Sequence, residues 1–377
     1  MRWLLAVLLV SLVGCVTNDP WPEAEAAKKR AEQRLDACRL EPASADAYPL
    51  LAPVFSPTKQ AAYLDLGQGY SVAKQAFVVE NAEVQRSAAT FDRVLPGQAL
   101  ARHHIDWPGE PEGETLYGLG SSLVARGALH QERGRLLPAL DCYLRCAELG
   151  RLMVVNADWE LWLQASRTSR LGLAAAERLL AQQKLPPTSY RRILERLEPL
   201  LAAEHDLERL AELELVRQQQ HVEWLKAGQH PELPELDAAL QMRVEHEVRT
   251  FGQAVMEWYP HLGQLTLPEN ARRLDNQVRY GGRICGITGF EIPVFSQAIE
   301  AHREHLYLLG AVRLRAALEL ARVKTGRYPD EPKELVAAGY LEAVPEGFSY
   351  TNRGASYNLT WPNPSEARPV PPSPAAP

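Results

Sequence analysis

Apolar residues recur every three or four positions over most of the chain from residue 115 onward, and this period constrains the fold more than any other feature. Such spacing places apolar side chains along one face of an α-helix. The pattern predicts helices over residues 115–128, 136–155, 159–183, 189–203, 206–227, 236–259 and 294–324. Because the breaks are short, neighbouring helices should run antiparallel. We therefore expect a mainly α fold of antiparallel helical hairpins.

Composition narrows the class of protein further. Of 377 residues, 46% are apolar and 23% are charged, which excludes wholesale disorder and a membrane protein with many spans. The net charge of −6 gives no basic excess for a nucleic-acid partner, and charge runs such as Arg191-Arg192 are too short for such a footprint.

The two ends of the chain differ from its middle. Residues 23–40 predict a charged helix with a thin apolar stripe, and prolines interrupt the stretch that follows. The last 16 residues contain seven prolines, which predicts a disordered tail. We divide the chain into residues 1–14, 15–57 (tether and charged helix), 58–280 (helical domain), 281–361 (long helix and β-hairpin) and 362–377.

Residues 3–14 are apolar apart from Ser11, and Arg2 precedes them. Twelve helical residues span about 18 Å, less than the roughly 30 Å of a bilayer's hydrocarbon core. A signal peptide fits this segment better than a permanent membrane span.

The segment ends in Leu12-Val13-Gly14-Cys15, which resembles the lipobox of bacterial lipoprotein signal peptides. The resemblance implies that Cys15 receives diacylglycerol and becomes the first residue of the mature chain, which fatty acyl chains such as palmitate then anchor to a membrane. It implies a place in the bacterial cell envelope, facing the periplasm or the exterior. Val16, where an aspartate would retain the protein at the inner membrane, favours the outer membrane. The alternative is an ordinary secretory signal with a coincidental cysteine.

Residues 122–151 resemble one tetratricopeptide (TPR) helical hairpin. Small residues in that family let two helices approach closely, and an aromatic ring fills the space beside them. The matching positions are Leu123, Gly127, Ala139, Tyr143 and Cys146. Thirty-four residues later the glycine and alanine positions hold Leu161 and Leu173, so the pattern does not repeat. We expect a TPR-like hairpin at 115–155 rather than a repeat array.

Residues 317–359 resemble the distal half of type II secretion pseudopilins, in which a long helix leads into a short helix and a small β-hairpin. The matching residues are Gly326, Tyr328, Pro329, Leu335, Tyr340, Leu341 and Pro345. The expected strands are 348–351 and 356–361, with a turn at Asn352-Arg353-Gly354. Because no prepilin cleavage motif is present, the resemblance implies a packing unit rather than a pilus subunit.

Four further cysteines, Cys38, Cys142, Cys146 and Cys285, leave two, one or no disulfides open. Cys142 and Cys146 lie four apart on a predicted helix, where Cβ atoms are about 6 Å apart, against about 3.8 Å in a disulfide. Core packing is the favoured interpretation of this pair, and a metal site is the alternative.

Several histidines have neighbours that could act with them as metal ligands. His103-His104 lies with Asp106 in a Gly/Pro-rich loop, which favours a solvated surface. His302 and His305 flank Glu304 on the long helix, where His302 continues an apolar stripe and should be buried. His246-Glu247 begins a zinc-protease motif, but Thr250 replaces its second histidine. We predict no metal and no cofactor.

The remaining motifs favour structure over chemistry. The glycine-rich residues 281–289 lack the preceding strand that a phosphate-binding loop needs. Trp159 and Trp162 have the spacing of core residues. The apolar stripe predicted for the long helix is Leu306, Leu309, Val312, Ala316, Leu320 and Val323.

The sequence thus favours a lipid-anchored scaffold or protein-interaction lipoprotein of the cell envelope, without catalysis and with an unidentified protein partner. The first alternative is a lipoprotein that binds a ligand or solute in a groove between helices. The second is an enzyme whose site has no recognisable motif. A groove with convergent polar groups would favour the alternatives, and an open apolar helical face would favour the scaffold.

Overall fold

A computed structural model of the chain describes residues 112–153, 159–202 and 295–361, together with the single residues 25, 26, 29, 33, 242, 272 and 273. The chain divides into two compact units. One comprises Met1–Ala37, His103–Pro108 and Asp206–Phe295, and the other comprises Cys38–Arg102, Gly109–His205 and Ser296–Pro377. The architecture below is that of the second unit, which contains the helices and strands of the three long described ranges.

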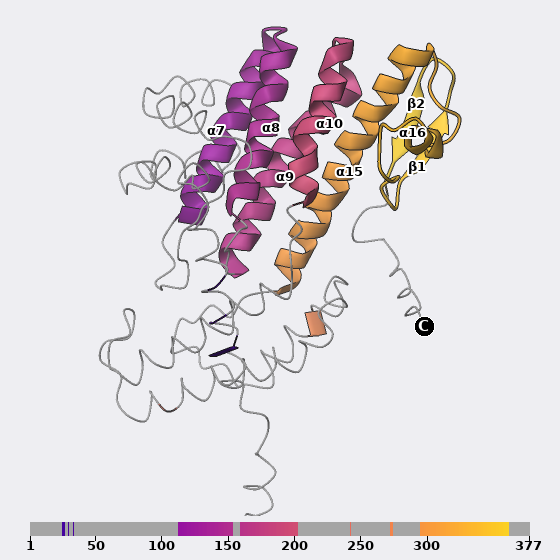
Figure 1. The fold of residues 1–377 in the computed structure, drawn as a ribbon. Helices are drawn as coiled ribbons and strands as arrows, with labels where there is room; N and C mark the ends of the chain where they lie inside the picture. The colour runs from indigo at the N-terminus through magenta and orange to yellow at the C-terminus, as the bar shows by residue number, and fades with distance from the viewer. Residues whose placement is uncertain are drawn as a thin grey trace, which may run out of the picture. The chain divides into compact units, whose positions relative to one another are not determined.

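These ranges form six helices and two strands (Figure 1). They are α7 (Glu112–Glu132), α8 (Leu136–Met153), α9 (Trp159–Gln182), α10 (Pro187–Ala202), α15 (Phe295–Thr325), α16 (Lys333–Ala337), β1 (Ser349–Asn352) and β2 (Tyr357–Thr360). The predicted fold class, mainly α with a small C-terminal β-hairpin, is confirmed. Helices predicted over 206–227 and 236–259 lie outside the described residues.

Helix α7 continues to Glu132, past its predicted end at residue 128, because its termination signal lies at Gly134. This glycine has φ +70°, a conformation in which a side chain would be strained. The amide of Arg135 donates to the carbonyl oxygen of His130, and that of Gly134 donates to Gln131. These two bonds form a Schellman motif, which satisfies the last carbonyl groups of the helix.

Helix α10 begins at Pro187, two residues before the predicted start. Proline suits the first position of a helix, because its fixed φ is helical and the amide it lacks would have no partner there. The amide of Ser189 donates to the carbonyl oxygen of Pro186 at 2.9 Å and closes the first turn.

Helices α7, α8 and α9 pack against one another through small residues. A Cβ added to Gly120, Gly150 or Gly172 would come within 3 Å of an atom on a neighbouring helix. At Gly150 and Gly172 the obstructing atoms include backbone atoms of the neighbouring helix. Two side chains also bond across this interface: Cys146 Sγ donates to the carbonyl oxygen of Thr168 at 3.2 Å, and Ser169 Oγ donates to that of Ala147 at 3.3 Å.

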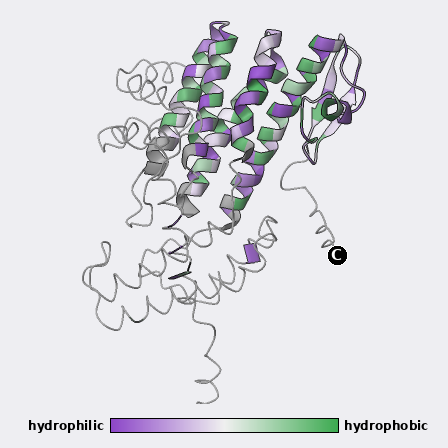
Figure 2. Cartoon of the chain, in the orientation of Figure 1, coloured by the Kyte–Doolittle hydropathy of each residue, from purple (hydrophilic) through white to green (hydrophobic). Residues whose placement is uncertain are grey.

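Helices α8, α9, α10 and α15 share one hydrophobic core. Figure 2 shows apolar residues along the helices, interrupted by hydrophilic ones. Among the fully buried members are Ala139, Leu173, Leu179, Tyr190, Leu197, Val312 and Ala316. Three ion pairs join α9 and the residues just after it to α15: Arg170–Glu304, Glu177–Arg315 and Lys184–Glu319. From one pair to the next, the residue numbers increase in both partners. Helices α9 and α15 are therefore parallel neighbours.

The predicted apolar stripe of α15 is correct at Leu309, Val312, Ala316 and Leu320 but wrong at its two ends. Leu306 is 49% exposed and Val323 is 37% exposed, whereas His305 is buried at 4%. Both 305 and 306 fit the helical spacing, and hydropathy favoured the leucine. Tertiary packing instead places the histidine against the core.

The C-terminal residues form a second core on α15. Strands β1 and β2 pair antiparallel, with Ser349 opposite Thr360 and Asn352 opposite Tyr357. The turn overlaps its predicted position at Arg353 and Gly354, whereas Asn352 is the last residue of β1. Arg353 donates its amide to Ser356 at 2.9 Å, and Gly354 has φ +77°. Buried members of this core are Leu314, Ala317, Leu318, Ala321, Tyr328, Leu335, Leu341 and Leu359.

Candidate functional site

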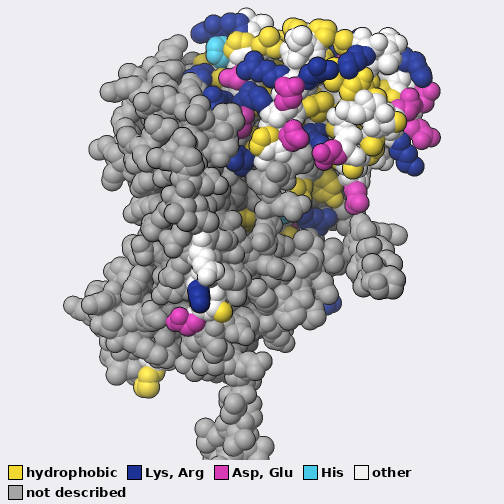
Figure 3. Space-filling model, in the orientation of Figure 1, with side chains coloured by type: hydrophobic (Ala, Val, Ile, Leu, Met, Phe, Trp, Pro, Cys, Tyr) yellow, Lys and Arg dark blue, Asp and Glu magenta, His cyan; other side chains and the backbone are white. Residues whose placement is uncertain are grey.

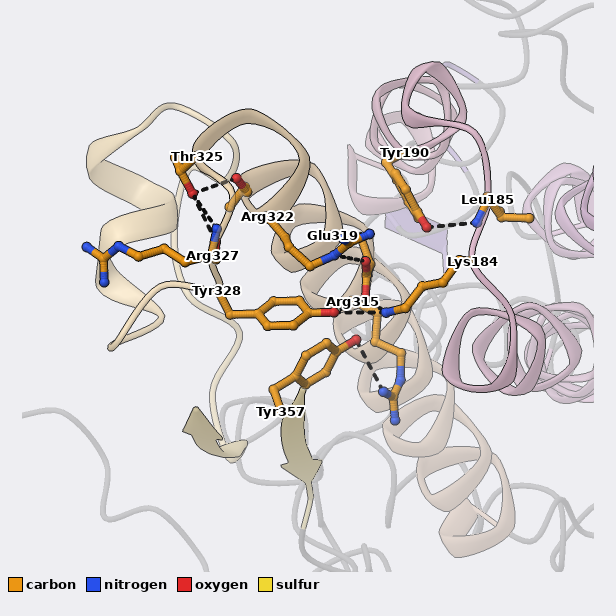
Figure 4. A network of polar contacts seen from close by, with 11 residues as sticks. Lys184, Leu185, Tyr190, Arg315, Glu319, Arg322, Thr325, Arg327, Tyr328 and Tyr357 are labelled. Atoms are coloured by element: carbon orange, nitrogen blue, oxygen red, sulfur yellow. Dashed lines mark hydrogen bonds and ion pairs between the residues drawn. The ribbon is translucent and has the colours of Figure 1, made fainter. Parts of the chain in front are cut away.

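A buried polar group with three side-chain partners lies on α15: the carboxylate of Glu319 (Figure 4). Its side chain is 1% exposed. Oxygen Oε1 accepts from the Lys184 ammonium and from the Tyr328 hydroxyl, the latter at 2.8 Å. Oxygen Oε2 accepts from Arg322 Nε at 3.0 Å. One carboxylate thus joins the α9–α10 connection, α15 and the segment that leads into the β-hairpin.

Electrostatics hold Glu319 in its charged form. Burial alone would raise the pKa of this carboxyl, but hydrogen bonds from Lys184, Tyr328 and Arg322 outweigh burial and lower the pKa below its usual value. Burial and the bond to Glu319 raise the pKa of Tyr328, so its hydroxyl remains a donor. Lys184 Nζ also donates to the Tyr328 hydroxyl at 2.8 Å, which closes a ring of three groups.

A second ion pair lies one helical turn earlier on α15. Arg315 Nε donates to Glu177 on α9 at 2.7 Å, and both side chains are largely buried. The other arm of the guanidinium, Nη1, lies 3.4 Å from the hydroxyl of Tyr357 on β2. Burial alone would lower the pKa of Arg315, but Tyr357 and Glu177 raise it. Like Glu319, Arg315 connects α9 with the C-terminal hairpin.

The arrangement of these groups suits structural cohesion better than proton transfer. A general base needs a carboxylate with a free oxygen that can reach a substrate proton. Both oxygens of Glu319 already accept hydrogen bonds within the protein, and the lowered pKa of its carboxyl lies well below neutral pH. The network therefore acts as a clamp between elements that are more than 130 residues apart in sequence.

The predicted burial of His302 is correct, since its side chain is 8% exposed. Its ring centroid lies 5.1 Å from that of Trp162 on α9 and 6.3 Å from that of His305. Burial, and for His302 also the neighbouring His305, lowers the pKa values to about 3 and about 4 respectively. Both imidazoles are neutral at pH 7, and Glu304 between them in sequence pairs with Arg170 instead.

The residues predicted for the TPR-like hairpin lie together between α7 and α8. Leu123, Ala139 and Cys146 are fully buried, and Tyr143 is 3% exposed. A Cβ on Gly127 would overlap the Tyr143 ring and lie 3.1 Å from the carbonyl oxygen of Ala139. The Tyr143 hydroxyl reaches the end of α7 and donates to Gln131 at 3.0 Å.

Cys142 and Cys146 are both buried and are not joined in a disulfide. Burial raises the pKa of Cys146 to about 12, which keeps it a thiol. Within the described ranges no three side chains among His, Cys, Asp and Glu gather as a metal site would require. In the same part of the chain, no helix combines the length and the apolar character needed to cross a membrane.

Several predicted positions lie outside the described residues. They are Cys15 and the rest of the lipobox, Cys38, Cys285, His103-His104, His246, the glycine-rich residues 281–289 and the proline-rich tail.

Four residues of this network were not predicted from the sequence: Glu319, Lys184, Arg315 and Glu177. A signal for Glu319 was available, because this acidic residue stands between Ala316 and Leu320 on the apolar stripe and has an arginine three residues later. A charged residue on a buried face requires a partner. Nothing in the local pattern pointed to Lys184, which is 135 residues away.

Comparison of the chain with protein-family models, with curated proteins and with solved structures gave no match, so the site stands on its own geometry.

Proposed function

We propose that this chain is a lipid-anchored protein of the bacterial cell envelope that serves as a scaffold for a protein partner and does not catalyse a reaction. The observation that carries the anchor is the segment Leu12-Val13-Gly14-Cys15 at the end of a short apolar stretch. Acyl chains contribute about 0.8 kcal/mol per buried CH₂, so two or three of them hold a protein on a membrane without a spanning helix.

The described helices support the scaffold part of the proposal. Their interfaces are close backbone contacts at glycine, as at Gly150 and Gly172, which leave little freedom for one helix to slide along another. The buried charges, Glu319 and Glu177, are used in bonds between elements. These two properties are those of a rigid domain that binds a partner through its surface.

The anchor is tested by replacing Cys15 with serine in cells that receive a radiolabelled or clickable fatty acid. We expect the wild-type protein to carry the label and to sediment with membranes, and the C15S protein to do neither. Cys38→Ser is the matched control, because it removes a thiol outside the lipobox and should leave labelling intact. Equal labelling of wild type and C15S would refute the anchor.

The scaffold is tested by placing a photo-crosslinking amino acid at exposed positions of α10, such as Thr188 and Glu195. We expect a discrete crosslinked species of constant mass at positions on one face of the domain. Loss of that species should accompany substitutions that unfold the domain, such as those at Gly172. A smear without a defined product at every exposed position would contradict a specific partner.

A further inference from the structure

One end of the helical domain is strongly basic. The α7–α8 turn, the α9–α10 connection and the last turns of α15 lie at this end, at the top of Figure 1. We call the exposed cations of residues 128–139, 178–192 and 320–325 the basic end. They are Arg133, Arg135, Arg178, Lys184, Arg191, Arg192 and Lys324.

The charge at this end is of one sign. Across those three segments the exposed carboxylate is that of Glu132. Seven exposed cations and one exposed carboxylate leave an excess of about six positive charges. The partly buried Arg322 and the buried Glu319 beside Lys184 have opposite charges and do not change this excess. The whole chain carries −6, so the basic end contrasts with the rest of the protein. Figure 3 shows Lys and Arg side chains gathered along the top of the domain.

Contacts within the domain place several of these cations near one another. Arg135 and Arg133 act electrostatically on His130 and, with burial as the larger cause, lower its pKa. Lys184 and Arg322 both bond to Glu319. Glu132 of the first segment and Arg178 of the second both act electrostatically on Tyr143, so these two segments lie close together. The α7–α8 turn and the α9–α10 connection therefore border one continuous surface.

The placement of these cations differs from that of structural ion pairs. Deeper in the domain Arg196 bonds to both Asp141 and Glu148, and Arg315 bonds to Glu177. At the basic end, Glu132 is the exposed acidic side chain within the three segments, and the next exposed ones lie beyond them, at Glu195 along α10 and at Asp330 after α15. Like charges that gather at one end repel one another, and a polyanion would relieve that repulsion.

We propose that the basic end binds the surface of an anionic phospholipid bilayer. The proposal rests on the proposed function, because a lipid anchor would hold the domain close to such a surface. Each Lys or Arg near an anionic bilayer is stabilised through the negative surface potential, and this attraction fades within a Debye length. The end of a helical domain presents its cations together, which suits a flat surface of headgroups better than a narrow groove.

Single-stranded nucleic acid is a poorer fit, because its binding sites interleave cations with exposed aromatic platforms. Aromatic rings near these cations serve the fold: Tyr328 is buried with its hydroxyl on Glu319, and Tyr190 is buried with its hydroxyl accepting from the Leu185 amide. The Tyr340 ring, 4.8 Å from the Lys324 ammonium, is partly buried and packs against both cores. A bilayer would attract the basic end through charge without aromatic stacking, so binding should depend on the salt concentration and on the fraction of anionic lipid.

The test uses the full chain with residues 1–14 removed and Cys15→Ser, so that no acyl chain contributes. Cosedimentation measures partitioning onto vesicles of phosphatidylcholine with about one third phosphatidylglycerol. We expect the Arg191→Gln, Arg192→Gln double variant to partition about thirtyfold less, at about fivefold per residue. Adding Arg133→Gln and Arg135→Gln should lower partitioning further by a comparable factor.

The matched control is Arg167→Gln with Arg303→Gln, which removes the same charge about 16 Å or more along the helices from the basic end. It should partition within about twofold of the parent, with circular dichroism verifying that all variants fold. Equal binding to pure phosphatidylcholine, or equal losses in both double variants, would overturn the proposal. So would salt-sensitive binding to RNA or to an anionic glycan without binding to the vesicles. Because C15S protein is used, none of these outcomes depends on whether the lipid anchor exists.

Discussion

Helices α7, α8 and α9 are joined through small side chains, whereas the C-terminal hairpin is joined to α15 and α9 through charged and aromatic side chains. In the first region Gly150 and Gly172 bring backbones into contact, and side chains such as Cys146 and Ser169 donate to carbonyl oxygens across it. In the second, Glu319 and Arg315 each bond to two or more elements. The first region should therefore respond to added volume, and the second to lost charge.

The largest effect is expected in the first region. Gly172→Val places a side chain where the carbonyl oxygen of Tyr143 and the amide of Ala147 already lie. Because backbone cannot move aside as a flexible side chain can, we expect a loss of about 4 kcal/mol in the free energy of unfolding, measured by urea denaturation. Gly134→Ala is the control. It has open space around the added Cβ and a strained φ of +70°, so it should lose only about 1 kcal/mol.

The second region is tested by Glu319→Ala, which removes the common partner of Lys184, Arg322 and Tyr328. We expect a loss of about 3 kcal/mol, because a buried tyrosine hydroxyl loses its acceptor and an ion pair is broken. Glu319→Gln should recover part of this loss, since its amide oxygen can still accept a bond. Hydrogen exchange should increase in the β-hairpin more than in α7 and α8. Uniform exchange in both regions would mean that the two regions are not separate in their response.

The two histidines add a pH dependence where α9 and α15 meet. Burial lowers the pKa of His305 to about 4, whereas the unfolded chain binds a proton near 6.5. Stability is thus complete above pH 6.5 and falls as the pH decreases towards 4. At pH 5 we expect His305 to contribute a loss of about 2 kcal/mol, by linkage.

His305→Leu should abolish that part of the loss between pH 7 and pH 5. The contribution of Glu319 falls in a separate, more acidic window, because its lowered pKa keeps the carboxylate charged until the pH passes below its usual value. Parallel pH profiles of wild type and His305→Leu would contradict the assignment.

The smallest effect is expected at Asp330→Asn. Its ion pair with Arg327 has a length of 3.0 Å, but both side chains are more than 60% exposed. Solvent screens such pairs, so the loss should be under about 1 kcal/mol, and salt should diminish it further. The thermal midpoint in low and high salt measures it. If Asp330→Asn lost as much stability as Glu319→Ala, burial could not explain why some ion pairs stabilise the domain more than others.

Local patterns predicted the elements well. Helical spacing placed α8, α9 and α15 within two residues of their observed ends, and the turn at Asn352-Arg353-Gly354 lies between the predicted strands. Capping explains the small errors, since Gly134 and Pro187 set ends that apolar spacing does not report. Which residues of a helix are buried was harder to predict. His305 and Leu306 show the reason, because two adjacent residues can fit one helical stripe equally well.

The polar network was beyond reach of the sequence because its members come together only through tertiary structure. Lys184 and Glu319 are 135 residues apart, and Glu177 and Arg315 are 138 apart. Apart from Glu319, which stands on the apolar stripe of α15, each of these residues alone resembles an ordinary surface charge. Tyr328 was noticed only through its place in a resemblance, which did not indicate that its hydroxyl would meet Glu319.

Because α9 and α10 share their core with α15, this core can form only after a long intervening segment has been synthesised. The chain completes α10 at Ala202, but α15, which shares its core, ends only at Thr325. At about 5–20 residues per second, the ribosome needs roughly 6–25 s to make the intervening residues. For that interval Leu179, Leu197 and the other apolar residues of α9 and α10 lack the helix that completes their core. A nascent chain of this design is thus exposed to misassociation long before its clamp at Glu319 can close.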